Sequence, residues 1–225
     1  MIIKKADQNY QIRELEYKKK MGIVTFSWRF REATDFLVFI YDSRQDFNLT
    51  TAKEIIEDAG FSGKDIINST KKLITLRKNR TLKMLHIGRR EFLNNNRRLQ
   101  FPVNEFKKNI PYGISVYACN YIEDGKKIYI YQAVLEDNTC FFPVLINADI
   151  QYKKIPFSKD KLCILQLPVI DGYKDGAIMY HVSGIVPDFP LPQQCLGREL
   201  AITIPRQSEV SIRIQEEYKK YYKDR

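Results

Sequence analysis

Apolar and polar residues alternate with a period of two along several short segments of this chain. In residues 22–30, Val24, Phe26 and Trp28 alternate with polar neighbours, as in a strand with one buried face. Residues 35–42, DFLVFIYD, are apolar on both faces, which is typical of a central strand covered on both sides. These patterns predict β-structure in the first half of the chain.

The clearest local signal is the segment 112–132, which predicts a β-hairpin. Two alternating runs flank Glu123-Asp124-Gly125, and glycine accepts the positive φ that such a turn requires. A second hairpin is predicted in residues 82–103, where two strand-like runs meet at Asn94-Asn95-Asn96. Asparagine tolerates left-handed backbone conformations, so we expect the turn at this point.

Two segments of the first half depart from the strand pattern. Residues 48–62 predict one short helix, because Thr51 and Glu54 have the spacing of a capping box and Gly60 follows the apolar run. Residues 1–20 form a charged lead-in, for which we expect a short helix or a loose tail.

The second half also predicts short strands with no long helix between them. Turns are expected at Asp171-Gly172 and Asp175-Gly176. We therefore predict an all-β chain of two tandem antiparallel β-sandwich domains, residues 21–133 with a short inserted helix and residues 134–215, and a tail at 216–225 that is a short helix or frayed. The predicted strands of the second half lie in residues 140–155, 161–169, 177–185, 199–205 and 209–214.

Residues 21–133 resemble a fibronectin type III domain. The likeness rests on the early strand with Trp28, on the apolar strand 35–42, and on YGISVYAC, which is similar to the family's Y-x-I-x-V-x-A strand. The resemblance implies a two-sheet antiparallel sandwich. It also implies that Tyr112 bonds across a corner to upstream backbone, and that three side chains of its strand face the core: Ile114, Val116 and Ala118.

Residues able to do chemistry are few. His86 and His181 lie in separate strand-like runs, with no His-x-His, Glu-x-x-His or Cys-x-x-Cys motif beside them, so each is either a packed histidine or an isolated base or ligand. Asp171 and Asp175 are either turn formers or acids of a hydrolase. No nucleotide-binding loop occurs. We expect no catalytic residue, no metal and no cofactor.

The N-terminal residues contain no apolar export segment, and no run of about 18 apolar residues could cross a bilayer. The sequence therefore predicts a cytoplasmic protein without a membrane contact. Its cysteines are expected to be buried thiols in a reducing compartment. They are Cys119, Cys140, Cys163 and Cys195.

Charge is distributed unevenly along the chain. Between Lys71 and Lys108 there are twelve basic residues and two acidic ones, a net charge of +10 that equals the formal charge of the whole chain. The predicted Asn94–Asn96 hairpin would bring Arg89 and Arg90 close to Arg97 and Arg98. Four guanidinium groups at one tip repel one another and favour a compensating anion.

We therefore expect a non-enzymatic protein that binds an acidic macromolecule, with an acidic protein surface ahead of nucleic acid. The predicted contact consists of Arg77, Arg80, Arg89, Arg90, Arg97 and Arg98. Alternatively, these charges only protect an edge strand from pairing with other chains. A further alternative is a carbohydrate-binding module, if the hairpin exposes the side chains of Tyr117, Tyr121, Tyr129 and Tyr131.

Overall fold

The computed structural model describes residues 1–225 except 33–34, 69–73, 79, 122–126, 134–137 and 225; the side chains of 67–68, 74, 76–78, 80–81 and 121 are also outside the described part. Within it the chain is mainly β, as predicted. It divides into two compact units, Met1–Lys107 with Tyr112–Phe142 and Lys108–Pro111 with Pro143–Arg225. Whether these units are the two predicted domains stays a prediction.

The first unit contains two β-sheets. The large sheet has the strand order β1-β9-β8-β4-β6-β5, with β10 also paired to β8, and the small sheet has the order β2-β3-β7. The elements are β1 (Ile2–Lys4), η1 (Gln8–Tyr10), β2 (Ile12–Lys20), β3 (Ile23–Phe30), β4 (Asp35–Asp42), α1 (Leu49–Asp58), α2 (Gly63–Asn68), β5 (Ile74–Lys78), β6 (Arg80–Gly88), α3 (Arg89–Asn94), β7 (Arg98–Pro102), η2 (Val103–Glu105), β8 (Tyr112–Tyr121), β9 (Ile128–Tyr131) and β10 (Thr139–Phe142).

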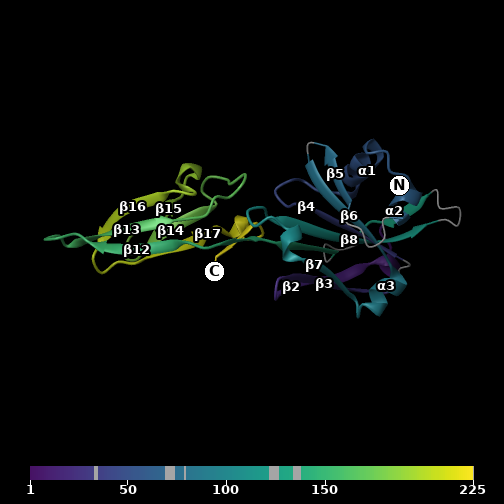
Figure 1. The fold of residues 1–225 in the computed structure, drawn as a ribbon, viewed down its shortest axis with the longest axis horizontal. Helices are drawn as coiled ribbons and strands as arrows, with labels where there is room; N and C mark the ends of the chain where they lie inside the picture. Colours follow the sequence, from purple (N-terminus) through teal and green to yellow (C-terminus); the bar gives the residue numbers. More distant parts are fainter. Residues whose placement is uncertain (33–34, 69–73, 79, 122–126, 134–137, 225) are drawn as a thin grey trace. The chain divides into compact units, whose positions relative to one another are not determined.

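The large sheet is the middle layer of this unit, between the small sheet and helices α1 and α2 (Figure 1). Successive residues of β4 point to opposite faces. Leu37 and Phe39 pack in one core cluster with Ile56 of α1, while Phe36 contacts Trp28 of the small sheet. The prediction that 35–42 is a central strand buried on both faces is therefore confirmed.

The hairpin predicted at 112–132 is confirmed, because β8 and β9 pair in antiparallel fashion; its turn residues Glu123-Asp124-Gly125 lie outside the described residues. Tyr112 begins β8, and its hydroxyl accepts a hydrogen bond of 3.1 Å from the backbone N–H of Lys107. This is the upstream bond that the resemblance implied. The side chains of Ile114, Val116 and Ala118 are buried, as expected.

The hairpin predicted around Asn94–Asn96 is wrong. Strand β6 pairs with β4 and β5 of the large sheet, whereas β7 pairs with β3 of the small sheet. Both sides of β6 already have partners, so β7 cannot pair with it. The residues between them form the short helix α3, which carries the chain from one sheet to the other (Figure 1).

The charged lead-in is mainly β-structure, strands β1 and β2 with the one-turn 3-10 helix η1 between them, rather than an α-helix or a loose tail. Strand β2 pairs with β3, and a β-bulge shifts the register between Arg13 and Glu16, with Glu14 at φ 52°. The extra residue of a bulge interrupts the alternation of side chains. For this reason the buried residues Ile12 and Leu15 are three positions apart, a spacing that imitates helical periodicity.

Helix α1 confirms the prediction for 48–62, with one correction at its start. The N-cap is Asn48, whose side-chain oxygen accepts from the backbone N–H of Thr51 at 2.9 Å. Gly60 adopts φ 76° directly after the C-cap, as expected. The sequence did not predict α2, which begins after Ser62. There the Asp65 carboxylate accepts from the backbone N–H of Ser62 at 2.8 Å, as in a capping box.

The second unit consists of two three-stranded antiparallel sheets and one parallel pair. Their strand orders are β12-β13-β16, β15-β14-β17 and β11-β18. Its elements are β11 (Val144–Ile146), β12 (Asp149–Lys154), β13 (Asp160–Gln166), β14 (Ile178–Val182), β15 (Phe189–Pro190), η4 (Gln193–Cys195), β16 (Glu199–Pro205), β17 (Val210–Ile214), η5 (Glu216–Tyr218) and β18 (Tyr222–Asp224). Residues predicted as strands in the second half are confirmed.

The predicted tail belongs to this core. Tyr222 is 1% exposed, and β18 pairs in parallel with β11. The buried Tyr222 ring holds the segment against the unit. The predicted tail therefore consists of the short 3-10 helix η5 followed by the paired strand β18, and is not a frayed end. Among the described residues, no helix is long and apolar enough to cross a membrane. All four cysteines are free thiols, and only Cys119 and Cys163 are buried.

Candidate functional site

Helix α3 is fixed to the core of the first unit by one aromatic side chain. The ring of Phe92 stacks on Trp28 with a centroid distance of 3.9 Å and an interplanar angle of 14°. It also meets Phe36 edge-on at 5.2 Å. Phe92 is fully buried, and aromatic pairs add stability beyond the area that they bury. The helix therefore presents its remaining residues from a fixed base.

A buried carboxylate holds the first turn of α3. Gly88 is the N-cap and supplies no side-chain cap. Instead, Oδ1 of Asp35 accepts from the backbone N–H of Arg89 at 3.0 Å, and Oδ2 lies 3.0 Å from Nε2 of His86. His86 is 2% exposed. It is thus a packed histidine, the first of the two roles that the sequence left open.

The last turn of α3 ends in a Schellman motif. The backbone N–H of Arg97 donates to the carbonyl of Phe92 at 2.9 Å, and that of Asn96 donates to Leu93 at 3.0 Å. Asn96 and Arg97 have φ angles of 55° and 57°. The left-handed conformation expected for the asparagine segment is therefore present, although it ends a helix instead of joining two strands.

Four arginines lie on or next to this anchored element: Arg89 and Arg90 begin α3, Arg97 follows it, and Arg98 begins β7. We call these residues the α3 arginine cluster. All four side chains are exposed. The guanidinium carbons of Arg89 and Arg97 lie 5.9 and 5.7 Å from the ring centroid of Phe30, within the range of a cation–π contact.

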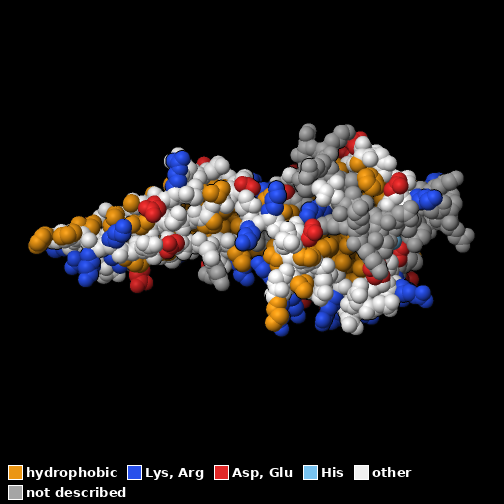
Figure 2. All heavy atoms as spheres, viewed as in Figure 1, with side chains coloured by type: hydrophobic (Ala, Val, Ile, Leu, Met, Phe, Trp, Pro, Cys, Tyr) orange, Lys and Arg blue, Asp and Glu red, His pale blue; other side chains and the backbone are white. Residues whose placement is uncertain are grey.

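In the described part of the chain, no carboxylate lies within 4 Å of any guanidinium nitrogen of the α3 arginine cluster. Lys and Arg side chains project along the lower margin of the first unit in Figure 2, over the region of β2, β3 and α3. The cluster is therefore a site of positive charge that the described carboxylates do not neutralise by ion pairs.

The two other predicted contact residues lie elsewhere. Arg80 begins β6 and Arg77 is in the adjacent strand β5, paired with Thr81; their side chains are outside the described part. Strand β6 extends for eight residues beyond Arg80 before α3 begins, roughly 26 Å at the rise of a β-strand. The structure does not bring Arg77 and Arg80 to the cluster.

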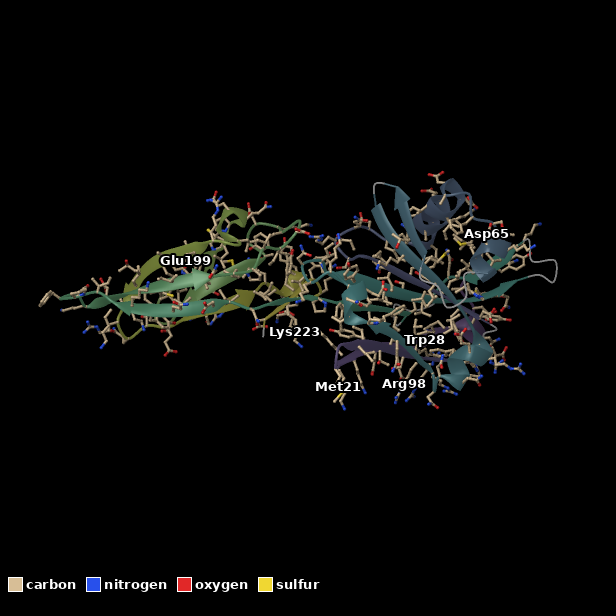
Figure 3. The ribbon with its side chains drawn as sticks, viewed as in Figure 1. Met21, Trp28, Asp65, Arg98, Glu199 and Lys223 are labelled. Carbon is tan, nitrogen blue, oxygen red and sulfur yellow. The ribbon has the colours of Figure 1, made fainter. Side chains whose placement is uncertain are left out.

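Strand β2 adds basic residues beside the cluster that the sequence did not indicate. The outer face of the small sheet carries Arg98 of β7 together with Lys18 and Lys20 of β2, because the register places Arg98 beside Ser27 and Lys18 beside Thr25. Figure 3 shows Trp28 on the inner side of this sheet and Arg98 on its outer side. The period-2 pattern would have given this signal if the β2 bulge had been recognised.

A groove of about 800 Å³ lies beside the cluster. Its apolar lining includes Leu85 and Ile87 of β6, while Arg98 and Gln100 of β7 contribute polar groups. Volumes of this order are usual for ligand-binding clefts. The groove is further lined by Glu91, Asn94, Asn95, Asn96, Leu99, Phe101, Pro102 and Glu105.

The expected tyrosine surface is not present among the described side chains. Tyr117 packs against the core cluster under the helices and meets Phe39 at 6.0 Å. Tyr131 stacks on Tyr10 at 3.9 Å, and Tyr129 lies under Lys4. The side chain of Tyr121 is outside the described residues. Tyr117 shares the helix-covered face of the sheet with Ile128 and Ile130, whereas Tyr129 and Tyr131 alternate with those residues and point to the opposite face. The described rings therefore do not form one surface.

One group of charged and titratable side chains in the second unit is held by internal bonds. Nδ1 of His181 lies 2.6 Å from Oδ1 of Asp188, and Arg213 lies 3.1 Å from the other oxygen of that carboxylate. The hydrogen bond with His181 is the main cause that lowers the pKa of Asp188, and Arg213 lowers it further. Asp175 accepts from the backbone N–H of Gln193 at 2.6 Å.

Asp171 accepts from the side-chain amide of Asn109 at 2.5 Å. Asp171 and Asp175 therefore anchor loops, which is the turn-forming alternative. Among the described residues, no group of three or more His, Cys, Asp or Glu side chains could hold a metal ion.

The chain matches no protein-family model, and no curated protein matches it.

Proposed function

We propose that the chain is a non-enzymatic, cytoplasmic β-sandwich protein that binds an acidic surface of another protein through the α3 arginine cluster. The observation that carries the proposal is the concentration of Arg89, Arg90, Arg97 and Arg98 on an anchored turn, with no carboxylate of the described residues within ion-pair distance. Arginine binds carboxylates through two parallel hydrogen bonds. A partner surface rich in Asp and Glu would satisfy these donors.

The anchoring supports a binding role over edge protection alone. Edge protection requires only that charges lie on the strand, whereas here two guanidinium groups share the ring of Phe30. Side chains held in place before binding lose less entropy when the complex forms. Such a contact favours a partner of fixed geometry.

Acidic protein is a better match than nucleic acid. Single-stranded nucleic acid is usually bound by exposed aromatic rings that stack on the bases. Near the cluster, Trp28, Phe36 and Phe92 are buried against one another, and the half-buried ring of Phe30 is covered by Arg89 and Arg97. Nucleic acid is therefore the alternative outcome of the test below.

We further propose that the first unit is fibronectin type III-like. Three features support this assignment: the core residue Trp28, the corner bond of Tyr112, and the passage of consecutive strands β3 and β4 into different sheets. Because such sandwiches carry many unrelated functions, this assignment supports a binding scaffold and names no ligand.

The test is fluorescence anisotropy with a labelled peptide rich in Asp and Glu, beside duplex DNA, single-stranded DNA and RNA, at low and near-physiological salt. We expect the acidic peptide to bind, with an affinity that falls as salt screens the charges. Replacing Arg89, Arg90, Arg97 and Arg98 by Glu should weaken peptide binding by at least about a hundredfold, since each charged hydrogen bond contributes about 1.5–3 kcal/mol.

The matched control reverses four exposed basic residues of the second unit, Lys153→Glu, Lys154→Glu, Lys159→Glu and Arg206→Glu. It changes the net charge by the same amount and should leave peptide binding nearly unchanged. Equal losses in both variants would show that net charge alone acts. Binding of nucleic acid in preference to the peptide would replace the acidic protein by nucleic acid as partner.

A further inference from the structure

Strand β7 leaves one side of the small sheet open, directly beside the groove. Within the described residues β7 pairs only with β3. The open side of an edge strand presents backbone N–H and C=O groups to any extended chain that approaches. The groups that β7 presents follow from its register with β3.

The backbone N–H of Val103 donates to the carbonyl of Gly22 at 2.8 Å, so this residue pair is a hydrogen-bonded one. Hydrogen-bonded pairs recur at every second position of an antiparallel ladder. Leu99 and Phe101 therefore direct their backbone groups toward β3. Arg98, Gln100 and Pro102 direct theirs away from it.

Gln100 thus offers both a donor and an acceptor at the open side. The N–H of Arg98 is already bonded to the carbonyl of Asn95 at 3.1 Å, and Pro102 has no N–H, which suits a position without a strand partner. The carbonyl of Pro102, the N-cap of η2, accepts the first hydrogen bond of that 3-10 helix, and the carbonyl of Arg98 remains as an acceptor. Together these groups match the hydrogen bonds that a short added strand would make.

Side chains of an added strand would alternate between two surroundings. Leu99 and Phe101 point into the unit and are buried, so the inward side chains of the next strand would meet the apolar part of the groove at Leu85 and Ile87. Outward side chains would continue the face that carries Arg98. The inward positions favour apolar residues and the outward ones favour acids.

Charge distinguishes the two ends of the groove. Arg97 directly precedes β7 and Arg98 begins it, while Glu105 lies beyond its other end and is engaged by Lys83, whose Nζ donates to the Glu105 carbonyl at 2.8 Å. Glu91 of α3 also lines the groove, but the four arginines outnumber it at the α3 end. Acidic residues of a bound chain therefore belong at that end and on the outer face.

We propose that the partner contributes an extended segment of alternating apolar and acidic residues, which adds as a strand to the open side of β7. This inference rests on the proposed function and specifies the form of its partner. A second copy of this chain is a poorer occupant, because each copy carries a net charge of +10 and like charges repel.

The experiment compares three forms of one labelled peptide, Glu-Val-Glu-Thr-Glu-Val-Glu-Thr. The first is unmodified, and the other two are N-methylated at alternate backbone nitrogens, one in each register. N-methylation removes hydrogen-bond donors and keeps the charge. We expect at least one methylated form to bind at least about tenfold more weakly, because strand addition depends on main-chain hydrogen bonds.

The protein variants test the same contact from the other side. Gln100→Pro removes the outward N–H and leaves the backbone pairing with β3 in place, so it should weaken binding of the unmodified peptide by a similar factor. Gln100→Ala keeps the N–H and should leave that binding unchanged. In the wild-type protein, amide exchange at Gln100 should slow on peptide binding. If Gln100→Pro fails to fold, as judged by Trp28 fluorescence, the methylated peptides and the amide exchange decide.

The outcomes separate this inference from the proposed function. Equal binding of all three peptides and unchanged exchange at Gln100, with loss of binding in the four-arginine variant, would overturn strand addition and leave the arginine contact standing. Peptide binding that survives the four-arginine variant would overturn the proposed function. Self-association of the free protein that Gln100→Pro abolishes would assign the open side to a second copy and overturn the inference.

Discussion

Two groups of basic side chains, one in each unit, are held in opposite ways. In the second unit, Arg213 and His181 share the carboxylate of Asp188. In the first unit, the α3 arginine cluster has no carboxylate within ion-pair distance among the described residues, and the nearby Asp35 is engaged with His86 and the backbone of Arg89. The same residue types therefore form an internally paired group in one place and a surface for an external anion in the other.

The difference shows why position, rather than the number of basic residues, indicates function. An exposed ion pair contributes little to stability, so the Asp188 group has no evident role beyond local order. The arginines of the first unit instead lie on an element that a buried ring and a buried carboxylate hold in place. We expect the first unit to lose peptide binding when the anchors of α3 are removed. Removal of the Asp188 group should cost the second unit almost no stability.

The largest effect is expected for Phe92→Ala. Removal of a fully buried ring leaves a cavity beside Trp28 and should cost about 3–5 kcal/mol of unfolding free energy. Denaturant unfolding followed by fluorescence will measure it, since Trp28 is the single tryptophan. Leu93→Ala, the matched change at an exposed neighbour, should cost less than about 0.5 kcal/mol. Equal costs would contradict the role of Phe92 as the anchor of α3.

Alkaline pH should lower the unfolding free energy of the first unit through ionisation of Tyr41. Burial raises the pKa of Tyr41 from 10.0 to about 12, against an opposing hydrogen bond with Ser115. Stability is unaffected below about pH 10, where folded and unfolded chains both keep the proton. It falls between pH 10 and 12 as the unfolded chain ionises first, by roughly 2 kcal/mol at the upper limit.

Tyr41→Phe should reduce that pH dependence in the unfolding transition reported by Trp28. The rest comes from other tyrosines of the unit whose pKa values burial also raises, among them Tyr112 and Tyr117. Tyr173 of the second unit provides the matched control, because burial raises its pKa to about 12 as well. Tyr173→Phe should leave the Trp28 transition unchanged. A shift of that transition in the Tyr173 variant would show that the two units unfold together.

A smaller loss is expected for Asp35→Ala, about 1–3 kcal/mol, because it deprives the buried N–H of Arg89 of its acceptor. Asp35→Asn keeps one oxygen and should restore part of the stability. Amide exchange at Arg89 is the specific measurement, and we expect it to become faster in Asp35→Ala. Unchanged exchange there would mean that the carboxylate does not cap α3.

The smallest effect is expected in the second unit. The hydrogen bond with His181 lowers the pKa of Asp188, so His181→Ala should move that pKa upward, toward its ordinary value, in an NMR titration. The linked stability is present above the ordinary pKa of an aspartate and is lost as pH falls through the lowered one. Arg213→Ala, which removes the lesser cause, should produce a smaller shift. A larger shift than that of His181→Ala would reverse the assigned order of causes.

Asp188→Ala tests the comparison directly, because it removes the carboxylate that Arg213 and His181 share. We expect the acidic peptide to gain no measurable affinity for the second unit, since one released arginine does not reproduce an anchored group of four. Peptide binding to this variant after the α3 arginine cluster has been reversed to Glu would show that any released cation suffices.

The sequence by itself determined the β-strands and some of their faces. Alternation gave the buried face of β3, the double burial of β4 and the β8–β9 hairpin, because side chains on successive strand residues point in opposite directions. Gly60 marked the end of α1 through its positive φ. These signals are local, and a local pattern is sufficient to read them.

Only the tertiary structure decided how those strands are paired. Nothing within residues 82–103 shows that β6 is occupied on both sides by β4 and β5, so a hairpin was predicted where the chain changes sheets. The bulge at Glu14 likewise gave the buried residues of β2 a spacing that resembles helical periodicity. The arginines were visible in the sequence, but their grouping depends on Phe92 reaching Trp28, a contact between residues 64 positions apart in the chain. Long-range packing therefore made a local excess of charge into a defined surface.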